Sequence, residues 1–497
     1  MSSRPSTPTL LDPTVAGAAR PAGGLDRRRF LQGTLAVGGV SVLLPSWLVG
    51  LAGAAPLGAD DRILVVITLA GGNDGLDTVG PFGSGAYNDA RGPIAVSTAG
   101  AHAIGNGYYL HPNLSFLKSR WDAGQLAIVQ GVGHEADDHS HFSSMARWMN
   151  GSSSNGPWTT GWVGRWLDGA GLDGLGGVVI GDEGVPRPRV GPASSSVAVP
   201  TDGPLFGAST ESWEVAAFDC LQGFAGGSST RGQWGDVVGG AMAEAIDVSR
   251  VVDPVFASDT SDAEIVRDLQ LAARVINLDA GARVLGVNVG DFDTHDDHAG
   301  RHPVLMSELN AAIAAFYMEL NPAFANRVAI MTVSEFGRRV RRNGSGGTDH
   351  GTASVALLLG NSVAGGTYGA YPSLTGLDNR GDLKHTVDFR SLYASVLEGW
   401  LGADPVEVIG AQYETFTLFR DVVPNDPGAG GGGGGGTGGG GGGAGGGLYS
   451  LQALSPARVL DTRSGVGVRA GKVSAGEWVD LPVVGRGGVP SSGVGSV

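Results

Sequence analysis

Four short apolar runs stand out along the chain, and each is followed by a polar segment. The runs are 63–69 (ILVVITL), 126–130 (LAIVQ), 284–289 (VLGVNV) and 328–333 (VAIMTV). Short runs that are rich in β-branched residues and apolar on both faces are typical of buried strands in a parallel sheet. We therefore expect four strands of one sheet, with the polar segments at their carboxyl ends.

Three longer segments have apolar residues at a helical spacing. They are 263–278, 303–320 and 388–401, and the second begins with Pro303. Proline is favoured in the first turn of a helix, where its missing N–H is not needed. Helices that alternate with buried strands predict a doubly wound α/β fold, with a mostly parallel sheet between layers of helices.

The polar segments after the four runs hold carboxylates and imidazoles. In chain order they contain Asp74, then 134–141 (HEADDHSH), then Asp293 with His295, and finally Asp349 with His350. Because the carboxyl ends of parallel strands meet at one edge of the sheet, we expect these segments to converge. Paired carboxylates and imidazoles are typical ligands of a divalent ion, so the sequence predicts a metal site at this edge.

The composition narrows the classes of function. The 497 residues include 33 Lys and Arg and 48 Asp and Glu, which gives a net charge of −15. A chain this acidic lacks the basic face that nucleic-acid binding requires, so we expect no nucleic-acid partner. The single cysteine, Cys220, cannot form an internal disulfide and excludes Cys-rich zinc modules. Since no basic residue neighbours it in the sequence, we expect Cys220 to be a buried structural thiol.

One basic cluster runs against the acidic trend. Its members are Arg338, Arg339, Arg341 and Arg342, which lie between the last apolar run and Asp349. Two interpretations stay open at this point. The cluster is either a solvated loop or a positive patch that attracts an anionic substrate to the predicted site.

Residues 1–55 have the features of an export signal. The segment 26–32 (DRRRFLQ) matches the twin-arginine pattern, an uncharged apolar stretch follows over 33–55, and 52–54 (AGA) offers a cleavage site. We therefore expect export through the twin-arginine pathway, to the periplasm, the cell envelope or the medium. The alternative is that the apolar stretch is retained as a membrane anchor.

Near the other end, residues 428–447 are almost all glycine. Such a tract cannot bury a core and behaves as a flexible linker. It separates a main domain, 56–427, from residues 448–497, whose short β-like runs and Gly/Pro turns predict an incomplete β-rich domain. This C-terminal region is our candidate for association with the cell envelope.

Several motifs occur in order between residues 60 and 420. They include ILVVITLAGGNDGLDTVGPF, FDTHDDH, VSEFGRRVRRNGSGGTDHG and DFRSLYASVLEGWLG. Together they resemble the DUF1501 family of exported bacterial proteins, which is similar to the alkaline-phosphatase and sulfatase-like superfamily. The resemblance implies an alkaline-phosphatase-like fold with one or two divalent ions at the carboxyl edge of the sheet. Separately, 456–463 (PARVLDTR) resembles the start of a β-rich repeat of secreted proteins.

The resemblance also implies a set of metal ligands. They are Asp74, Asp293, His295, Asp349 and His350, with Asp291 as an alternative to Asp293. Carboxylate oxygens combined with imidazole nitrogens suit Zn²⁺ or Mn²⁺ better than a soft metal. For His298 and His302 we favour capping of the following helix over metal binding.

A hydrolase of this superfamily requires a nucleophile after an early strand. Ser140, between His139 and His141, is our candidate for that catalytic residue. The sequence has no Cys-x-Pro-x-Arg segment, from which a sulfatase forms its formylglycine. We expect an exported metal-dependent hydrolase of phosphate or sulfate esters, acting on a small anionic substrate. The alternative hypothesis is a non-catalytic exported envelope protein that retains the fold.

Overall fold

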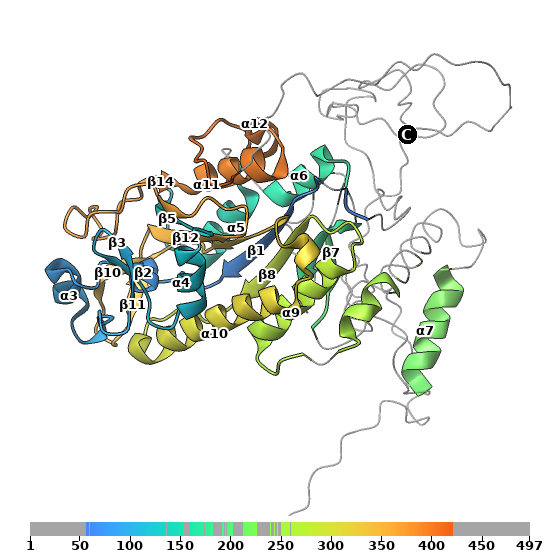
Figure 1. Cartoon of the computed structure of the whole chain (residues 1–497), viewed down its shortest axis with the longest axis horizontal. Coiled ribbons are helices and arrows are strands. Elements are labelled where there is room, and N and C mark those ends of the chain that lie inside the picture. The colour runs from blue at the N-terminus through green and yellow to red at the C-terminus, as the bar shows by residue number, and fades with distance from the viewer. Residues whose placement is uncertain are drawn as a thin grey trace, which may run out of the picture. The chain divides into compact units, whose positions relative to one another are not determined.

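A computed structural model of the chain describes residues 56–420 (Figure 1), with gaps at 59, 136, 153–158, 173, 182–190, 193, 195, 202–211, 226–238, 240–242, 244–245, 247–249 and 259. The predicted signal region, the glycine linker and the β-rich segment lie outside the described residues. Those predictions are therefore neither supported nor contradicted.

Nine strands of the described residues form one mixed sheet. They are β1 (Ile63–Leu69), β5 (Leu126–Gly133), β6 (Gly174–Ile180), β7 (Ser196–Val199), β8 (Val284–Val289), β9 (Val328–Val333), β12 (Ser354–Leu359), β13 (Gly366–Tyr368) and β14 (Val387–Asp388). Their order is β13-β5-β12-β9-β1-β8-β6-β7, with β14 beside β5. Within this sheet only β12 runs antiparallel to its neighbours. The four predicted strands are all present and parallel to one another, so their carboxyl ends meet at one edge.

Helices cover both faces of this sheet and form a hydrophobic core on each. The side chains of β1 alternate between these two cores. Ile63, Val65 and Ile67 join one core, and Leu64 and Val66 join the other. The first core includes α4 (Ser115–Asp122), α9 (Glu264–Asn277) and α10 (His298–Glu319), and the second includes α5 (His141–Asn150), α6 (Trp162–Gly169), α11 (Phe389–Val396) and α12 (Pro405–Ile409). Figure 1 shows α9 and α10 lying side by side along the sheet. The predicted doubly wound α/β fold is confirmed.

The three predicted helices are present with shifted bounds. The segment 263–278 corresponds to α9, and 388–401 corresponds to α11 continued by a π-helical turn over Leu397–Leu401. The segment 303–320 corresponds to α10, which begins earlier, at His298, so Pro303 lies inside the helix rather than at its start. Its first residues come directly from the loop after β8.

Two small sheets follow strands of the main sheet. One consists of β2 (Val79–Gly80), β3 (His102–Gly105) and β4 (Tyr108–Leu110), and the other is a hairpin of β10 (Arg338–Arg342) and β11 (Thr348–His350). The sequence predicted only loops here. The hairpin places Asp349 and His350 on a strand, with Arg338 paired opposite His350.

Two observations concern individual helices. Cys220 lies on α7 (Ser212–Ala225) and is exposed, so the expectation of a buried thiol is wrong. Within the described residues, no helix combines the length with the hydrophobicity that a bilayer span needs.

The segment between β5 and α5 is organised around a buried carboxyl group. Asp137 is only 5% exposed, and its Oδ1 accepts hydrogen bonds from the His139 amide (2.8 Å) and the Ser144 hydroxyl (3.0 Å). His139 adopts a left-handed conformation with a φ of 61°. Burial raises the pKa of Asp137 to about 6, because the charged form is poorly solvated there.

Asp137→Asn should remove a pH-dependent part of the free energy of unfolding. A carboxyl group whose pKa is raised by folding stabilises the protein below its unfolded pKa, about 3.9, and loses that contribution as the pH rises through the folded value. Wild-type protein should therefore lose up to about 3 kcal/mol from this group between about pH 4 and about pH 6.5. The asparagine variant keeps the acceptor oxygen and should not show this loss. Urea denaturation of both proteins across this range measures the difference, and parallel curves would contradict the prediction.

Candidate metal centre

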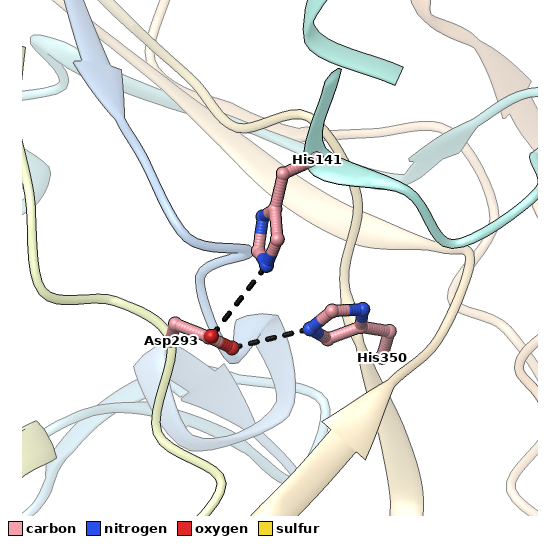
Figure 2. Close-up of side chains that lie close together, drawn as sticks. All are labelled: His141, Asp293 and His350. Atoms are coloured by element: carbon pink, nitrogen blue, oxygen red, sulfur yellow. Dashed lines mark hydrogen bonds and ion pairs between the residues drawn. The ribbon is translucent and has the colours of Figure 1, made fainter. Parts of the chain in front are cut away.

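Three side chains from three elements point toward one another where the strands end (Figure 2). Asp293 follows β8, His350 ends β11, and His141 begins α5. Nε2 of His350 lies 3.1 Å from Oδ1 of Asp293, and Nε2 of His141 lies 3.5 Å from Oδ2 of the same carboxylate. The ligand atoms of the three residues all lie within 4.8 Å of one another, which is close enough for one ion to reach all of them.

His295 joins this group from the same loop as Asp293. Its Nε2 lies 3.1 Å from Oδ1 of Asp293 and 2.8 Å from Nε2 of His350. Its other ring nitrogen, Nδ1, lies 3.2 Å from Oδ1 of Asp349. Asp349 therefore contacts the far side of the His295 ring. We call His141, Asp293, His295 and His350 the histidine cluster.

Each imidazole of the histidine cluster is fixed through its Nδ1. Besides the His295–Asp349 contact, Nδ1 of His141 lies 2.8 Å from Oε1 of the buried Glu335, and Nδ1 of His350 lies 2.8 Å from the carbonyl oxygen of His139. These partners are acceptors, so the tautomer protonated on Nδ1 satisfies them and leaves the Nε2 lone pair for an ion. Without an ion, the 2.8 Å contact between Nε2 of His295 and Nε2 of His350 requires a proton on one of these two nitrogens. Metal-binding histidines are typically held in this way. The Nε2 atoms of His141 and His350 and the Asp293 carboxylate, with His295 as a further candidate, are donors of the kind that suits Zn²⁺ or Mn²⁺.

The charge state of the histidine cluster also suits a cation. Burial alone would raise the pKa of Asp293, but the hydrogen bond and charge of Arg338 outweigh it, and the pKa falls to about 2. Burial lowers the pKa of His350, which favours the neutral ring that coordinates metals. The side chain of Asp293 is 44% exposed, so a molecule from solvent can reach it.

Arg338 lies behind the histidine cluster and is 1% exposed. It donates to Oδ1 of Asp293 at 2.5 Å and to four backbone carbonyls, those of Gly71, Gly72, Phe292 and Thr348. Of the two interpretations of the arginine cluster, neither applies to Arg338. It is a buried connection between three segments, whereas Arg341 and Arg342 are exposed.

The hairpin that carries His350 lies very close to the loop that carries His295. A Cβ atom on Gly347 would collide with the backbone of His295, so only glycine permits this approach. The backbone confirms the contact, because the Thr348 amide donates to the carbonyl oxygen of Thr294 at 3.1 Å. Glycine at this position therefore helps bring His295 and His350 together.

Asp74, the fifth predicted ligand, lies in a different group. Its carboxylate lies within 4.8 Å of Asp77 and His298, and all three residues are buried. Nε2 of His298 lies 2.8 Å from Oδ2 of Asp77 and 3.7 Å from Oδ2 of Asp74. We call these three residues the buried acidic group. The structure thus brings Asp293, His295, Asp349 and His350 together, and it places Asp74 apart from them.

The buried acidic group already holds a positive charge, the guanidinium of Arg91. Arg91 ends the short helix α3 (Gly85–Arg91) and donates to both oxygens of Asp74, at 2.5 and 2.8 Å. Burial alone would raise the pKa of Asp74 and Asp77, but the charge of Arg91 outweighs it and holds both below their usual value. His298 is therefore more than a helix cap, since its ring joins these carboxylates to Thr294 at 2.8 Å.

Ser140, the predicted nucleophile, is the residue that precedes the first turn of α5 and the ligand candidate His141. It is half-buried, and its amide donates to Oδ1 of Asp138 at 3.0 Å. Its hydroxyl makes no hydrogen bond to a described residue, so it is not committed to a structural role there.

Sequence reasoning missed His141, Glu335 and Arg338 as parts of this site. His141 lies in a segment with three histidines, and nothing in the sequence shows which of them starts a helix at the sheet edge. The structure separates them, because burial lowers the pKa of His134 to about 4 and His139 turns its backbone oxygen to His350. Glu335 had a usable signal, since it follows β9 almost directly.

The family described as "Protein of unknown function (DUF1501)" matches residues 231–411 of the chain. This range contains Asp293, His295, Asp349 and His350, whereas Asp74 and His141 lie outside it. Comparison with curated proteins finds no match to the sequence.

Several solved structures resemble the chain weakly. The C-terminal periplasmic domain of EcEptC from Escherichia coli, in complex with Zn, is 10% identical, with coverage of 74% of this chain and 94% of that domain and a TM-score of 0.31. A protein in the alkaline phosphatase superfamily from Vibrio parahaemolyticus is 9% identical, with coverage of 80% and 79% and a TM-score of 0.29. The alkaline phosphatase from the Antarctic bacterium TAB5 is 12% identical, with coverage of 62% and 95% and a TM-score of 0.27. Scores of 0.27–0.31 are too low to transfer an activity to this chain.

Proposed function

We propose that the protein is an exported hydrolase of phosphate or sulfate esters that depends on one divalent ion, Zn²⁺ or Mn²⁺. The observation that carries this proposal is the common orientation of the three imidazoles in the histidine cluster. Each has its Nδ1 on an oxygen acceptor and its Nε2 directed at the carboxylate of Asp293. Export is inferred from the twin-arginine motif at 26–32.

A divalent ion bound here would supply a Lewis acid for the ester oxygens. Residues around the proposed ion have three further roles. Asp293 stays anionic because its pKa is about 2, Glu335 and the His139 carbonyl hold His141 and His350 in place, and Arg338 holds Asp293. Ser140 lies at the amino end of α5, where the helix dipole favours an anionic ester beside the hydroxyl. We assign Ser140 as the nucleophile that attacks the phosphorus or sulfur atom and displaces the alcohol of the ester. The leaving alkoxide would take up the serine proton, and water would then release phosphate or sulfate and restore the hydroxyl.

The proposal specifies one ion because the second possible position is filled. The buried acidic group has the carboxylates and the imidazole that a cation requires, yet the guanidinium of Arg91 already contacts both carboxylates there, with Nη1 2.5 Å from Asp74 and 3.5 Å from Asp77. A fully buried guanidinium between two carboxylates cannot leave without exposing an unpaired charge to a low dielectric. The buried acidic group therefore acts as a fixed support for the strand of His350, since the Thr348 hydroxyl donates to Oδ2 of Asp74 at 3.3 Å.

His350→Ala should weaken binding of Zn²⁺ at least about 10-fold without unfolding the domain, since a ligand in a prearranged donor set is lost. Metal content measured by mass spectrometry after equilibrium dialysis, together with circular dichroism, tests this. Wild-type protein should hold one ion per chain. His102→Ala is the control, because His102 is half-buried on β3 and its ring bonds to the carbonyl of Pro112 (2.9 Å), away from the histidine cluster. Equal metal content in both variants would contradict the assignment.

Arg91→Met should lower the free energy of unfolding by about 3–5 kcal/mol, because it leaves two buried carboxylates without their cation. The control is Lys118→Met, which breaks an exposed pair with Asp122 (2.6 Å) one helical turn away and should cost less than about 1 kcal/mol. Chemical denaturation of both variants measures the two values. Similar small losses would show that Arg91 does not provide the charge balance described here.

Ser140→Ala should retain the ion and lower ester hydrolysis at least about 1,000-fold, as loss of a nucleophile does. Ser143→Ala, on the same helix, should keep turnover within a few-fold of wild type. Chromogenic phosphate monoesters, phosphate diesters and sulfate esters, offered to protein loaded with Zn²⁺ or Mn²⁺, provide the measurement. Full activity of Ser140→Ala would remove this residue from the mechanism. A wild-type protein that hydrolyses none of these esters would instead support the non-catalytic alternative.

A further inference from the structure

A cleft of about 770 Å³ opens beside the histidine cluster. His141, Asp293 and Glu335 line one part of it, and α5 lines another. Its volume lies within the range of roughly 300–1,000 Å³ that is typical of sites for small molecules. The ion site and the cleft therefore form one continuous space.

The wall that α5 contributes is apolar. Phe142, Met145, Ala146 and Met149 all line the cleft, and their spacing puts them on one side of the helix. Trp148, on the adjoining side of α5, packs into the core, where its ring stacks on Phe389 with centroids 4.6 Å apart and Met145 and Met149 border the same space. We call the four cleft residues the α5 stripe.

The exposure of the α5 stripe is largest at its first residue. Phe142 is 91% exposed. Leaving a phenyl ring in water costs free energy relative to burying it. Met145, Ala146 and Met149 are half-buried, and together with Phe142 they form an apolar wall of the kind that lines ligand sites. Here the stripe begins one residue after His141, so its position relative to the ion site is fixed by the helix.

The charges in the cleft limit what an anionic group can bind there. Asp291, Asp293 and Glu335 line it, and the described lining residues include no lysine or arginine. An anionic ester would therefore depend on the ion for its positive charge. Further affinity must come from the apolar wall.

We propose that the substrate carries an extended apolar substituent, alkyl or aryl, which lies along the α5 stripe while its anionic ester group lies at the histidine cluster. The position of the ester group rests on the proposed function; the apolar specificity rests on the stripe. Phe142 and Met149 determine specificity in this arrangement, because they contact the substituent and not the reacting atoms.

The test uses alkylphosphonates, which keep an anionic head group and cannot be hydrolysed at the C–P bond. Calorimetry with Zn²⁺-loaded protein should give a dissociation constant that falls roughly twofold to fourfold for each methylene from methyl to octyl, as partial to full burial of a methylene gives. Protein without the ion should bind none of the series. A dissociation constant that does not change with chain length, or no binding by the loaded protein, would overturn the proposal.

Two matched variants identify the surface. Phe142→Ser should weaken octylphosphonate binding at least about fivefold and leave methylphosphonate unchanged. Met318→Ser removes another exposed apolar side chain, 87% exposed on α10, and should change neither value. An equal loss for both phosphonates in Phe142→Ser would assign that residue to the ion site and overturn the apolar assignment. A dimer in light scattering that is lost in Phe142→Ser would assign the stripe to a second copy of the chain, which also overturns it.

These binding measurements are independent of turnover. Chain-length-dependent binding by a protein that hydrolyses no ester would support the apolar specificity and contradict the hydrolase. Hydrolysis of small esters without any chain-length dependence would support the hydrolase and contradict the apolar specificity.

Discussion

The site depends on a buried guanidinium that joins segments far apart in the sequence. Arg338 bonds to backbone carbonyls in the segments after β1 and β8 and in its own hairpin partner, and it also holds Asp293. A guanidinium offers five N–H donors in one rigid plane, so a single side chain can contact all of these acceptors, with Nη2 shared among the carbonyls of Gly71 and Phe292 and the Asp293 carboxylate. Lysine at this position would leave buried carbonyls unpaired, at a cost of about 1–3 kcal/mol each. The placement of Asp293 and His350 follows from this connection.

Arg91 supplies a positive charge to one group of carboxylates at the edge of the sheet, and a divalent ion at the histidine cluster would supply a second. Arg91 belongs to the chain and is permanently present, whereas the histidine cluster has no arginine within it and faces solvent. Arg338 contacts the histidine cluster only from behind, through Oδ1 of Asp293. The arginine charge is buried, whereas an ion bound at the proposed centre would be accessible to solvent. This division fits a centre in which only the accessible cation meets a substrate.

The four main strands and three helices were predictable because their apolar patterns are local. The strand-end rule also predicted that Asp293, His295, Asp349 and His350 would meet. It placed Asp74 with them, because the rule locates a loop and not the direction of a side chain. What turns Asp74 away is Arg91, on a short helix whose position depends on tertiary packing. His141 was missed for a related reason, since its orientation depends on where α5 begins.

The antiparallel strand β12 has a consequence for the ion. It lies directly beside β9, so the hairpin segment 334–353 leaves the sheet from one strand and re-enters it on the adjacent one. Its two ends are therefore held close together before any ion arrives, and little loop entropy remains to be lost. The segment 334–353, which carries His350, would therefore not have to fold around the proposed ion. The rate of metal exchange should then be governed by ligand substitution and access from solvent, rather than by the slower ordering of a peptide segment.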